Sequence, residues 1–220
     1  MLRQWITVSF LGLLSVVVSA AEPSLLFEDD FSRGMSRWKP TDVKAWKVID
    51  TPEGKALSQF AASKYRPKHR SPLNYALVND LIVGDFILEA RLRSTTRDYG
   101  HRDLCLFFGW QSPEKFYYVH LAKKADDRAN QVFIVNGKDR AKISKTSTPG
   151  TPWTDGWHRV KLVRKVKDGT VEVYFDDMKK PIMTASDTTF SWGQIGVGSF
   201  DDTGDWRTVQ IRGVRVEKPE

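Results

Sequence analysis

The chain consists largely of short runs in which apolar and polar residues alternate, and turn-forming residues separate these runs. In residues 85–93, for example, Phe86, Leu88, Ala90 and Leu92 alternate with polar or charged residues along most of the run. A period of two is typical of a half-buried β-strand, whereas an amphipathic helix repeats every 3.6 residues. Because no stretch shows sustained helical periodicity, we predict an all-β protein.

The same criteria predict many strands, and this number implies an antiparallel β-sandwich of two packed sheets. A hairpin turn at Asp168-Gly169 supports the division, because glycine adopts the backbone conformations that tight turns need. Residues 141–156, rich in Ser, Thr, Pro and Gly, are predicted to form a surface loop. The predicted strands are residues 25–31, 46–49, 56–60, 75–78, 85–93, 103–110, 116–121, 131–136, 158–164, 170–175, 182–185, 193–200 and 209–217.

The first 21 residues have the pattern of a secretory signal peptide. Arg3 precedes an apolar run, and small residues follow it. We therefore predict a signal peptide at residues 1–20, cleaved near Ala20 or Ala21, and a single domain at residues 22–220. The protein is expected to be exported to a bacterial periplasm or the extracellular medium, with no membrane association after cleavage. An uncleaved membrane anchor is the alternative.

Cysteine content and charge bear on the compartment and on the partners. Cys105 is the only cysteine, so no disulfide can form within the chain, which favours a bacterial exported protein. The formal net charge of +7 favours anionic partners, although it also fits a solvated basic surface. The basic residues are spread out and no nucleic-acid motif is present, so an acidic polysaccharide is a better candidate than DNA or RNA.

Residues 101–120 combine strand patterns with ionisable groups. If Tyr117, Val119 and Leu121 face a core, Tyr118 and His120 lie together on the opposite face of the same strand. An aromatic and polar sheet face of this kind suits a saccharide.

Several motifs together resemble one superfamily: residues 26–32 (LFEDDFS), 157–160 (WHRV), 173–177 (VYFDD) and 193–198 (GQIGVG). They are similar to the concanavalin A-like jelly-roll superfamily, and within it to the bacterial 3-keto-disaccharide hydrolase and laminin-G-like domains. The resemblance implies two antiparallel sheets of six or seven strands, with glycan across the concave one. It also suggests a structural calcium ion, held by Asp29 or Asp30 together with Asp205; no other cofactor is expected.

Catalytic candidates are Glu89, Asp103 and His120. Glu89 and Asp103 would form a pair of glycosidase carboxyl groups if their strands were neighbours. Their alternative roles are structural: Glu89 in an ion pair with an arginine, and Asp103 in a hydrogen bond to His120. Arg91, Tyr118 and His120 also resemble, in spacing only, the constellation of jelly-roll alginate lyases. Neither zinc-binding histidine pairs nor a serine-esterase elbow occur in the sequence.

We therefore predict an exported carbohydrate-binding jelly roll with an oligo- or polysaccharide partner. The predicted substrate-binding residues are Arg91, Arg93, Tyr118, Gln131 and Trp110. We expect the glycan to lie across one sheet face, in a groove that carries Glu89, Arg91, Asp103, Tyr118, His120 and Gln131. A first alternative is a glycoside hydrolase acting on di- or oligosaccharides, or a polysaccharide lyase acting on acidic glycans. A second is a structural or protein-interaction sandwich that binds no glycan.

Overall fold

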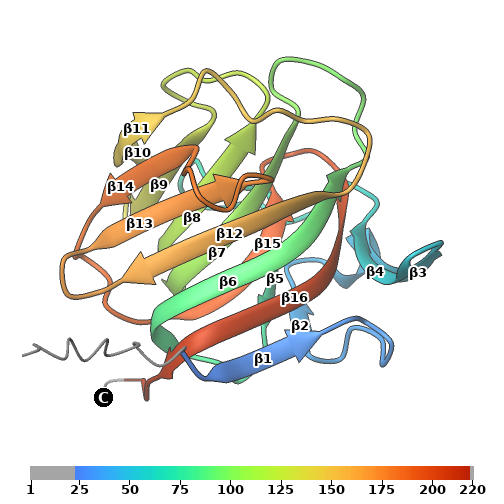
Figure 1. The fold of residues 1–220 in the computed structure, drawn as a ribbon, viewed down its shortest axis with the longest axis horizontal. Helices are drawn as coiled ribbons and strands as arrows, with labels where there is room; N and C mark the ends of the chain where they lie inside the picture. The colour runs from blue at the N-terminus through green and yellow to red at the C-terminus, as the bar shows by residue number, and fades with distance from the viewer. Residues whose placement is uncertain (1–22, 219–220) are drawn as a thin grey trace, which may run out of the picture.

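The structure is a computed structural model that describes residues 23–218, and these residues form two antiparallel β-sheets packed face to face (Figure 1). The predicted signal peptide and its cleavage site lie outside the described residues. The antiparallel two-sheet sandwich predicted from alternation is confirmed, and its strand arrangement agrees with the jelly roll that the resemblance implied. Within residues 23–218, no helix has the length and apolar character that crossing a membrane requires.

The first sheet has nine strands. In its main path, neighbouring strands follow the order β11 (Ser144–Ser147), β14 (Met183–Ser186), β13 (Thr170–Phe175), β12 (His158–Lys165), β6 (Val83–Ser94), β16 (Gly204–Arg215), β4 (Gly54–Gln59) and β3 (Trp46–Thr51). The ninth strand, β1 (Leu25–Asp29), pairs with β16 outside this path.

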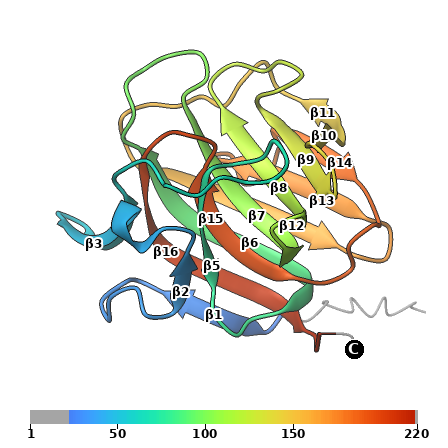
Figure 2. The same ribbon diagram turned by 180° about the vertical axis from the view of Figure 1, so that it is seen from behind.

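The second sheet has seven strands and lies in front in Figure 2. Its strand order is β10 (Ala141–Lys142), β9 (Gln131–Asn136), β8 (Lys115–Ala122), β7 (Asp103–Ser112), β15 (Gln194–Ser199), β5 (Asn74–Val78) and β2 (Trp38–Pro40). A short 3-10 helix, η1 (Val43–Ala45), precedes β3. The nine-stranded sheet is larger than the six or seven strands that the resemblance implied.

All the strands predicted from the sequence are present. β9 and β13 have the predicted ends, and the ends of the others are shifted, most of all in β16, which begins at Gly204. Three strands were missed: β2, β10 and β11. Two of these lie in residues 141–156, so the prediction of a loop there was partly wrong. β10 and β11 are short and polar, and a strand needs an apolar face before alternation can reveal it.

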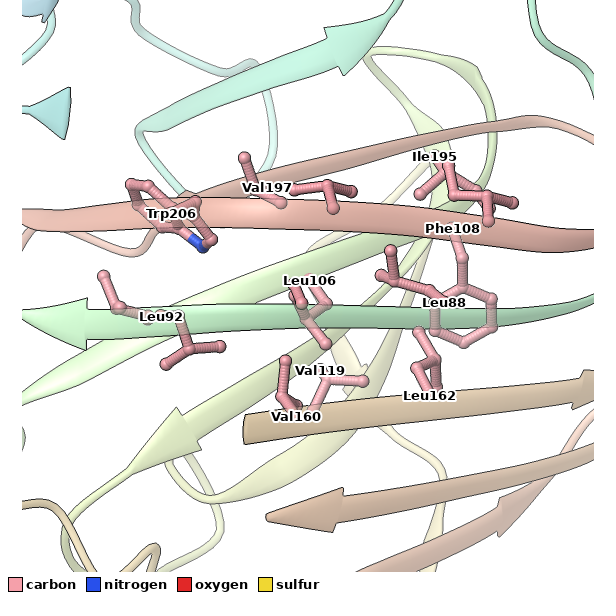
Figure 3. Packing of buried hydrophobic residues seen from close by; sticks show 14 of the residues in the cluster. Leu88, Leu92, Leu106, Phe108, Val119, Val160, Leu162, Ile195, Val197 and Trp206 are labelled. Carbon is pink, nitrogen blue, oxygen red and sulfur yellow. The ribbon is translucent and has the colours of Figure 1, made fainter. Parts of the chain in front are cut away.

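The core lies between the sheets, where the inward residues of each strand interdigitate (Figure 3). Leu88 and Leu92 of β6, with Leu162 of β12, meet Leu106 of β7 and Val119 of β8. All five of these side chains are fully buried. This is the arrangement that the alternation of β6 and β8 predicts.

The outer face of the seven-stranded sheet is also mostly closed. A second buried cluster lies there, which includes Phe107 and Tyr118, and the connection between β4 and β5 crosses in front of the sheet (Figure 2). Tyr65 of this connection packs edge-on against Tyr75 of β5, with ring centroids 5.7 Å apart. An open aromatic platform across the sheet is therefore absent from the part of the chain that the structure describes, and ligand access is limited to one end of it.

Candidate functional site

The residues predicted to share one groove lie on opposite sides of the sandwich. Glu89 and Arg91 belong to β6 of the nine-stranded sheet, whereas Asp103 and His120 belong to β7 and β8 of the seven-stranded sheet. The prediction of a single face carrying all of them was wrong. Although β6 and β7 are consecutive in sequence, they lie in different layers, so Glu89 and Asp103 cannot act as a pair across one glycosidic bond.

The β6 residues form local ion pairs on the outer face of their sheet. Arg159 Nη2 lies 3.7 Å from Glu89 Oε1. Arg93 Nη2 donates to Asp205 Oδ2 at 2.6 Å, and Arg91 is exposed. Glu89 thus has the structural role that the sequence analysis gave as its alternative, an ion pair with an arginine.

The pair predicted to hold calcium is already engaged in local contacts. Asp30 Oδ1 accepts the backbone N–H of Ser32 at 2.9 Å, and the Asp205 carboxylate is bound by the Arg93 guanidinium. Among the described residues, neither aspartate belongs to a group of three or more metal-ligating side chains. Arg93 occupies Oδ2 of Asp205, while Oδ1 is buried without a hydrogen-bond partner in the described part of the chain. The two aspartates do not fit a calcium ion well, because within residues 23–218 too few other ligand side chains lie near them to surround one.

A pocket of about 240 Å³ opens at the end of the seven-stranded sheet where β7 begins and β8 ends. We call it the basic pocket. Most of its lining comes from connections between strands, and only His120 lies within a strand. Its residues are Arg70, Tyr99, His101, His120, Arg128, Arg140, Phe200 and Asp201.

His120 and Asp103 form a buried pair at the base of the pocket. Nε2 of His120 lies 2.6 Å from Asp103 Oδ2, and Nδ1 lies 3.1 Å from the carbonyl oxygen of Arg128. A carbonyl oxygen only accepts, so Nδ1 carries a hydrogen, and the contact with Asp103 needs a second proton. Neither ring nitrogen has a free lone pair. His120 therefore orders the pocket wall, as the structural alternative predicted, and is poorly placed to act as a general base.

Arg140 is the best-anchored cation of the pocket. It donates through Nη1 to the hydroxyl of Tyr118 at 2.8 Å and through Nη2 to the carbonyl oxygen of Arg128 at 2.8 Å. Its guanidinium lies over the rings of Phe200 and Phe133, 4.3 and 4.7 Å from their centroids. These contacts fix the orientation of the group while leaving donors free, because a guanidinium has five N–H bonds.

Tyr118 is fully buried, so the prediction that it stacks on a sugar was wrong. Burial raises the pKa of its hydroxyl well above the ordinary value, so the group stays neutral and is unsuited to act as a base. The hydroxyl instead positions Arg140. The ring stacks on Phe107 and Phe133 of the neighbouring strands.

The remaining predicted binding residues lie beside the pocket or far from it. Gln131 is buried, and its Nε2 donates to the carbonyl oxygen of Asp126 at 3.0 Å. This bond orders the β8–β9 connection that carries Arg128. Trp110 is seven residues from Asp103 along β7, roughly 23 Å at the rise of an extended strand, and its ring packs near Tyr75.

A larger cavity of about 380 Å³ lies beside β1, lined by residues that include Glu28, Asp30, Arg33 and Arg37. None of its lining residues is aromatic. Arg37 is already used, since its Nη1 donates to the carbonyl oxygen of Glu28 at 2.6 Å. The basic pocket, with Tyr99 and Phe200 in its wall, is better suited to a saccharide.

Sequence reasoning found His120 but missed the other lining residues. Arg70, Arg128 and Arg140 lie on three different connections, and no spacing rule relates them. The one usable signal was the excess of positive charge, which indicates an anionic partner without saying where it binds.

Comparison with known proteins identifies the fold and no family. No protein-family profile matches the chain, and no curated protein is detectably similar in sequence. The resemblance to the 3-keto-disaccharide hydrolase family therefore stays a prediction.

Solved structures with the same architecture are distant in sequence. Carbohydrate-binding module CBM66 from Bacillus subtilis is 19% identical, with a TM-score of 0.57 over 81% of this chain and 97% of that one. Domain 4 of AbnA, an extracellular GH43 arabinanase from Geobacillus stearothermophilus solved with arabinotriose, is 12% identical, with a TM-score of 0.56 over 90% and 96%. The cellulose-induced protein Cip1 is 13% identical, with a TM-score of 0.58 over 88% and 100%. At these identities the similarity establishes the jelly-roll sandwich and nothing finer.

Proposed function

We propose that this chain is a carbohydrate-binding module whose basic pocket takes a saccharide with an acidic group, such as a uronate. The observation that carries the proposal is the set of three guanidinium groups in the pocket. Among the described residues, those of Arg70, Arg128 and Arg140 form no ion pair with any carboxylate. Arginine binds a carboxylate through two parallel hydrogen bonds, so three free guanidinium groups around one cavity favour an anionic ligand.

The pocket also has features that a sugar ring needs. Tyr99 places an aromatic ring in the wall, of the kind on which sugar C–H groups pack, and Asp201 can accept hydrogen bonds from hydroxyl groups. Two of the similar structures are themselves a carbohydrate-binding module and a domain solved with a trisaccharide. They support the proposal by showing that saccharide binding occurs on this fold.

The first test compares one polysaccharide in two chemical forms. Oligogalacturonate is titrated calorimetrically into the purified protein, and the same oligomer with its carboxylates reduced to alcohols serves as the matched ligand. We expect the acidic form to bind at least tenfold more tightly, and increasing salt to weaken its binding. Equal affinity for both forms would refute the proposal that the pocket recognises an acidic group. Failure to bind any member of a broad glycan panel would refute the module itself.

Substitutions locate the site. Arg128→Gln and Arg140→Met are each expected to weaken binding by about 10- to 100-fold, since a hydrogen bond to a charged group contributes about 1.5–3 kcal/mol. Arg91→Gln is the matched control, because it removes one exposed arginine from the opposite sheet. If Arg91→Gln weakens binding as much as Arg128→Gln, net charge rather than the pocket attracts the ligand.

The same incubation separates a binding module from an enzyme. New reducing ends would indicate the glycoside hydrolase alternative, and absorbance from an unsaturated product would indicate the lyase. The module predicts neither.

We also propose that the protein acts after export, as the N-terminal pattern predicts. Recovery of the protein from the periplasm or medium with an N-terminus near residue 22 would support export; retention of the full chain in the cytoplasm would refute it.

A further inference from the structure

Three aspartates meet beside the basic pocket. Asp103 begins β7, while Asp201 and Asp202 lie on the connection between β15 and β16. One carboxylate oxygen from each lies within 4.8 Å of the others. We call these residues the aspartate cluster. Among the described residues, no lysine or arginine forms an ion pair with any member, and His120 pairs only with Asp103.

The two carboxylate oxygens of Asp103 differ in their hydrogen-bond partners. Oδ2 faces three donors: His120 Nε2 at 2.6 Å, the Phe200 N–H at 3.0 Å and the Cys105 thiol at 3.6 Å. Oδ1 is buried and, within the described part of the chain, has no hydrogen-bond partner. An unpaired carboxylate oxygen in a fully buried residue carries a large desolvation penalty, so Oδ1 is expected to have a ligand.

Two hydrogen bonds orient the Asp202 carboxylate beside the backbone of Asp103. Its Oδ2 accepts the backbone N–H of Asp103 at 2.7 Å, and its Oδ1 accepts the hydroxyl of Tyr99 at 2.9 Å. The three carboxylates therefore lie close together, and no lysine or arginine of the described residues forms an ion pair with them. A bound cation would offset their mutual repulsion.

We propose that the aspartate cluster binds a divalent cation of the calcium type. Three oxygen atoms within 4.8 Å of one another have a common point no more than about 2.8 Å from each. A small inward rotation of the side chains would bring all three to the calcium–oxygen distance of about 2.3–2.6 Å. Ligands that are all carboxylate oxygens favour a hard cation. The adjacent softer groups are engaged: His120 has no free lone pair, and burial raises the pKa of the Cys105 thiol well above its ordinary value.

The ion would lie in the wall of the basic pocket, because Asp201 lines both sites. This position differs from the calcium site that the sequence resemblance suggested at Asp30 and Asp205. The cation site does not depend on saccharide binding, and its test contains no saccharide.

The experiment uses protein stripped with a chelator and then titrated with Ca²⁺, Mg²⁺ or Zn²⁺ by calorimetry. Terbium luminescence gives a second readout, because Tyr99 touches the cluster and can sensitise a bound lanthanide. We expect one Ca²⁺ per chain and a rise in melting temperature of roughly 5–10 °C at a hundredfold excess over Kd. Asp201→Asn and Asp202→Asn should each weaken Ca²⁺ binding by tenfold or more. Because Asp201 is exposed, the Asp201→Asn variant should fold normally.

Two controls identify the site. If the proposal is correct, Asp30→Asn leaves Ca²⁺ binding unchanged. If Asp30→Asn abolishes Ca²⁺ binding, the ion lies at β1 instead. Asp126→Asn removes an exposed aspartate beside His101 without touching the cluster, so it should also have no effect. The proposal is overturned if no cation binds, if Asp201→Asn binds Ca²⁺ as tightly as the native protein, or if Zn²⁺ binds more tightly than Ca²⁺ and is lost in Cys105→Ser.

Discussion

Tyr118→Phe tests whether a buried hydroxyl orients the basic pocket without touching its ligand. The change keeps a ring that stacks on Phe133 and removes only the oxygen that accepts from Arg140 Nη1 at 2.8 Å. A hydrogen bond to a charged group contributes about 1.5–3 kcal/mol. We therefore expect the free energy of unfolding to fall by about that amount, and the melting temperature to fall by roughly 3–12 °C for a chain of this length.

The effect on saccharide affinity should be much smaller. Arg140 keeps its bond to the carbonyl oxygen of Arg128 and its place over Phe200, so most of its orientation survives. We expect a loss of less than tenfold in Tyr118→Phe, compared with about 10- to 100-fold in Arg140→Met.

Urea unfolding followed by tryptophan fluorescence measures the stability, and calorimetric titration with an acidic oligosaccharide measures the affinity. Tyr174→Phe is the matched control, because it removes a hydroxyl that bonds Glu172 on the opposite sheet. A Tyr118→Phe protein with unchanged stability and abolished binding would refute the reasoning, since the hydroxyl would then contact the saccharide directly.

Three further predictions concern the frame around the site. Glu89→Gln should leave saccharide affinity unchanged in calorimetry and stability within about 0.5 kcal/mol. Glu89 lies on the nine-stranded sheet, away from the basic pocket, and within residues 23–218 its one ion-pair partner is the exposed Arg159. Gly198→Ala should destabilise the protein by about 1–3 kcal/mol in urea unfolding, since an added Cβ would lie 2.1 Å from the carbonyl oxygen of Asn74. Arg164→Met should lower the free energy of unfolding by about 3–5 kcal/mol in the same assay, because the buried guanidinium donates to the carbonyl oxygens of Gly169, Asp187 and Phe190. Gly169 would keep the Asp187 N–H as a donor, whereas the other two oxygens would lose the bond that Arg164 supplies.

Alternation predicted the strands well because their burial is decided locally. Along β6 the inward Leu88 and Leu92 are fully buried, while Glu89 and Arg91 face outward, as a period of two requires. The hairpin at Gly169 was predicted for a similarly local reason, since the φ of Gly169 is 71°, a value that glycine adopts without strain. Both features depend on neighbours in sequence alone.

Alternation gives no information about which sheet a strand joins. β6 and β7 are separated by only eight residues, and a hairpin was a natural interpretation. The strands instead pair elsewhere: β6 with β12 and β16, and β7 with β8 and β15. Period-two patterns show which side of a strand faces the core but not which layer contains the strand, and so the sequence prediction joined Glu89 to Asp103.

The connection between β6 and β7, whose path the sequence did not predict, also forms part of the site. Residues 95–102 cross from one sheet to the other at the end of the sandwich, and carry Tyr99 and His101 to the rim of the basic pocket. Arg102 fixes the crossing, because its buried guanidinium donates to the Ser94 carbonyl oxygen at 2.9 Å and to the Thr154 carbonyl oxygen at 3.0 Å. A chain that passes between layers must leave its strand pairing, and its polar side chains then become free to converge on a cavity. The pocket therefore lies where periodicity ends, so strand patterns predicted the strands and the position of His120 but could not predict the loop residues around it.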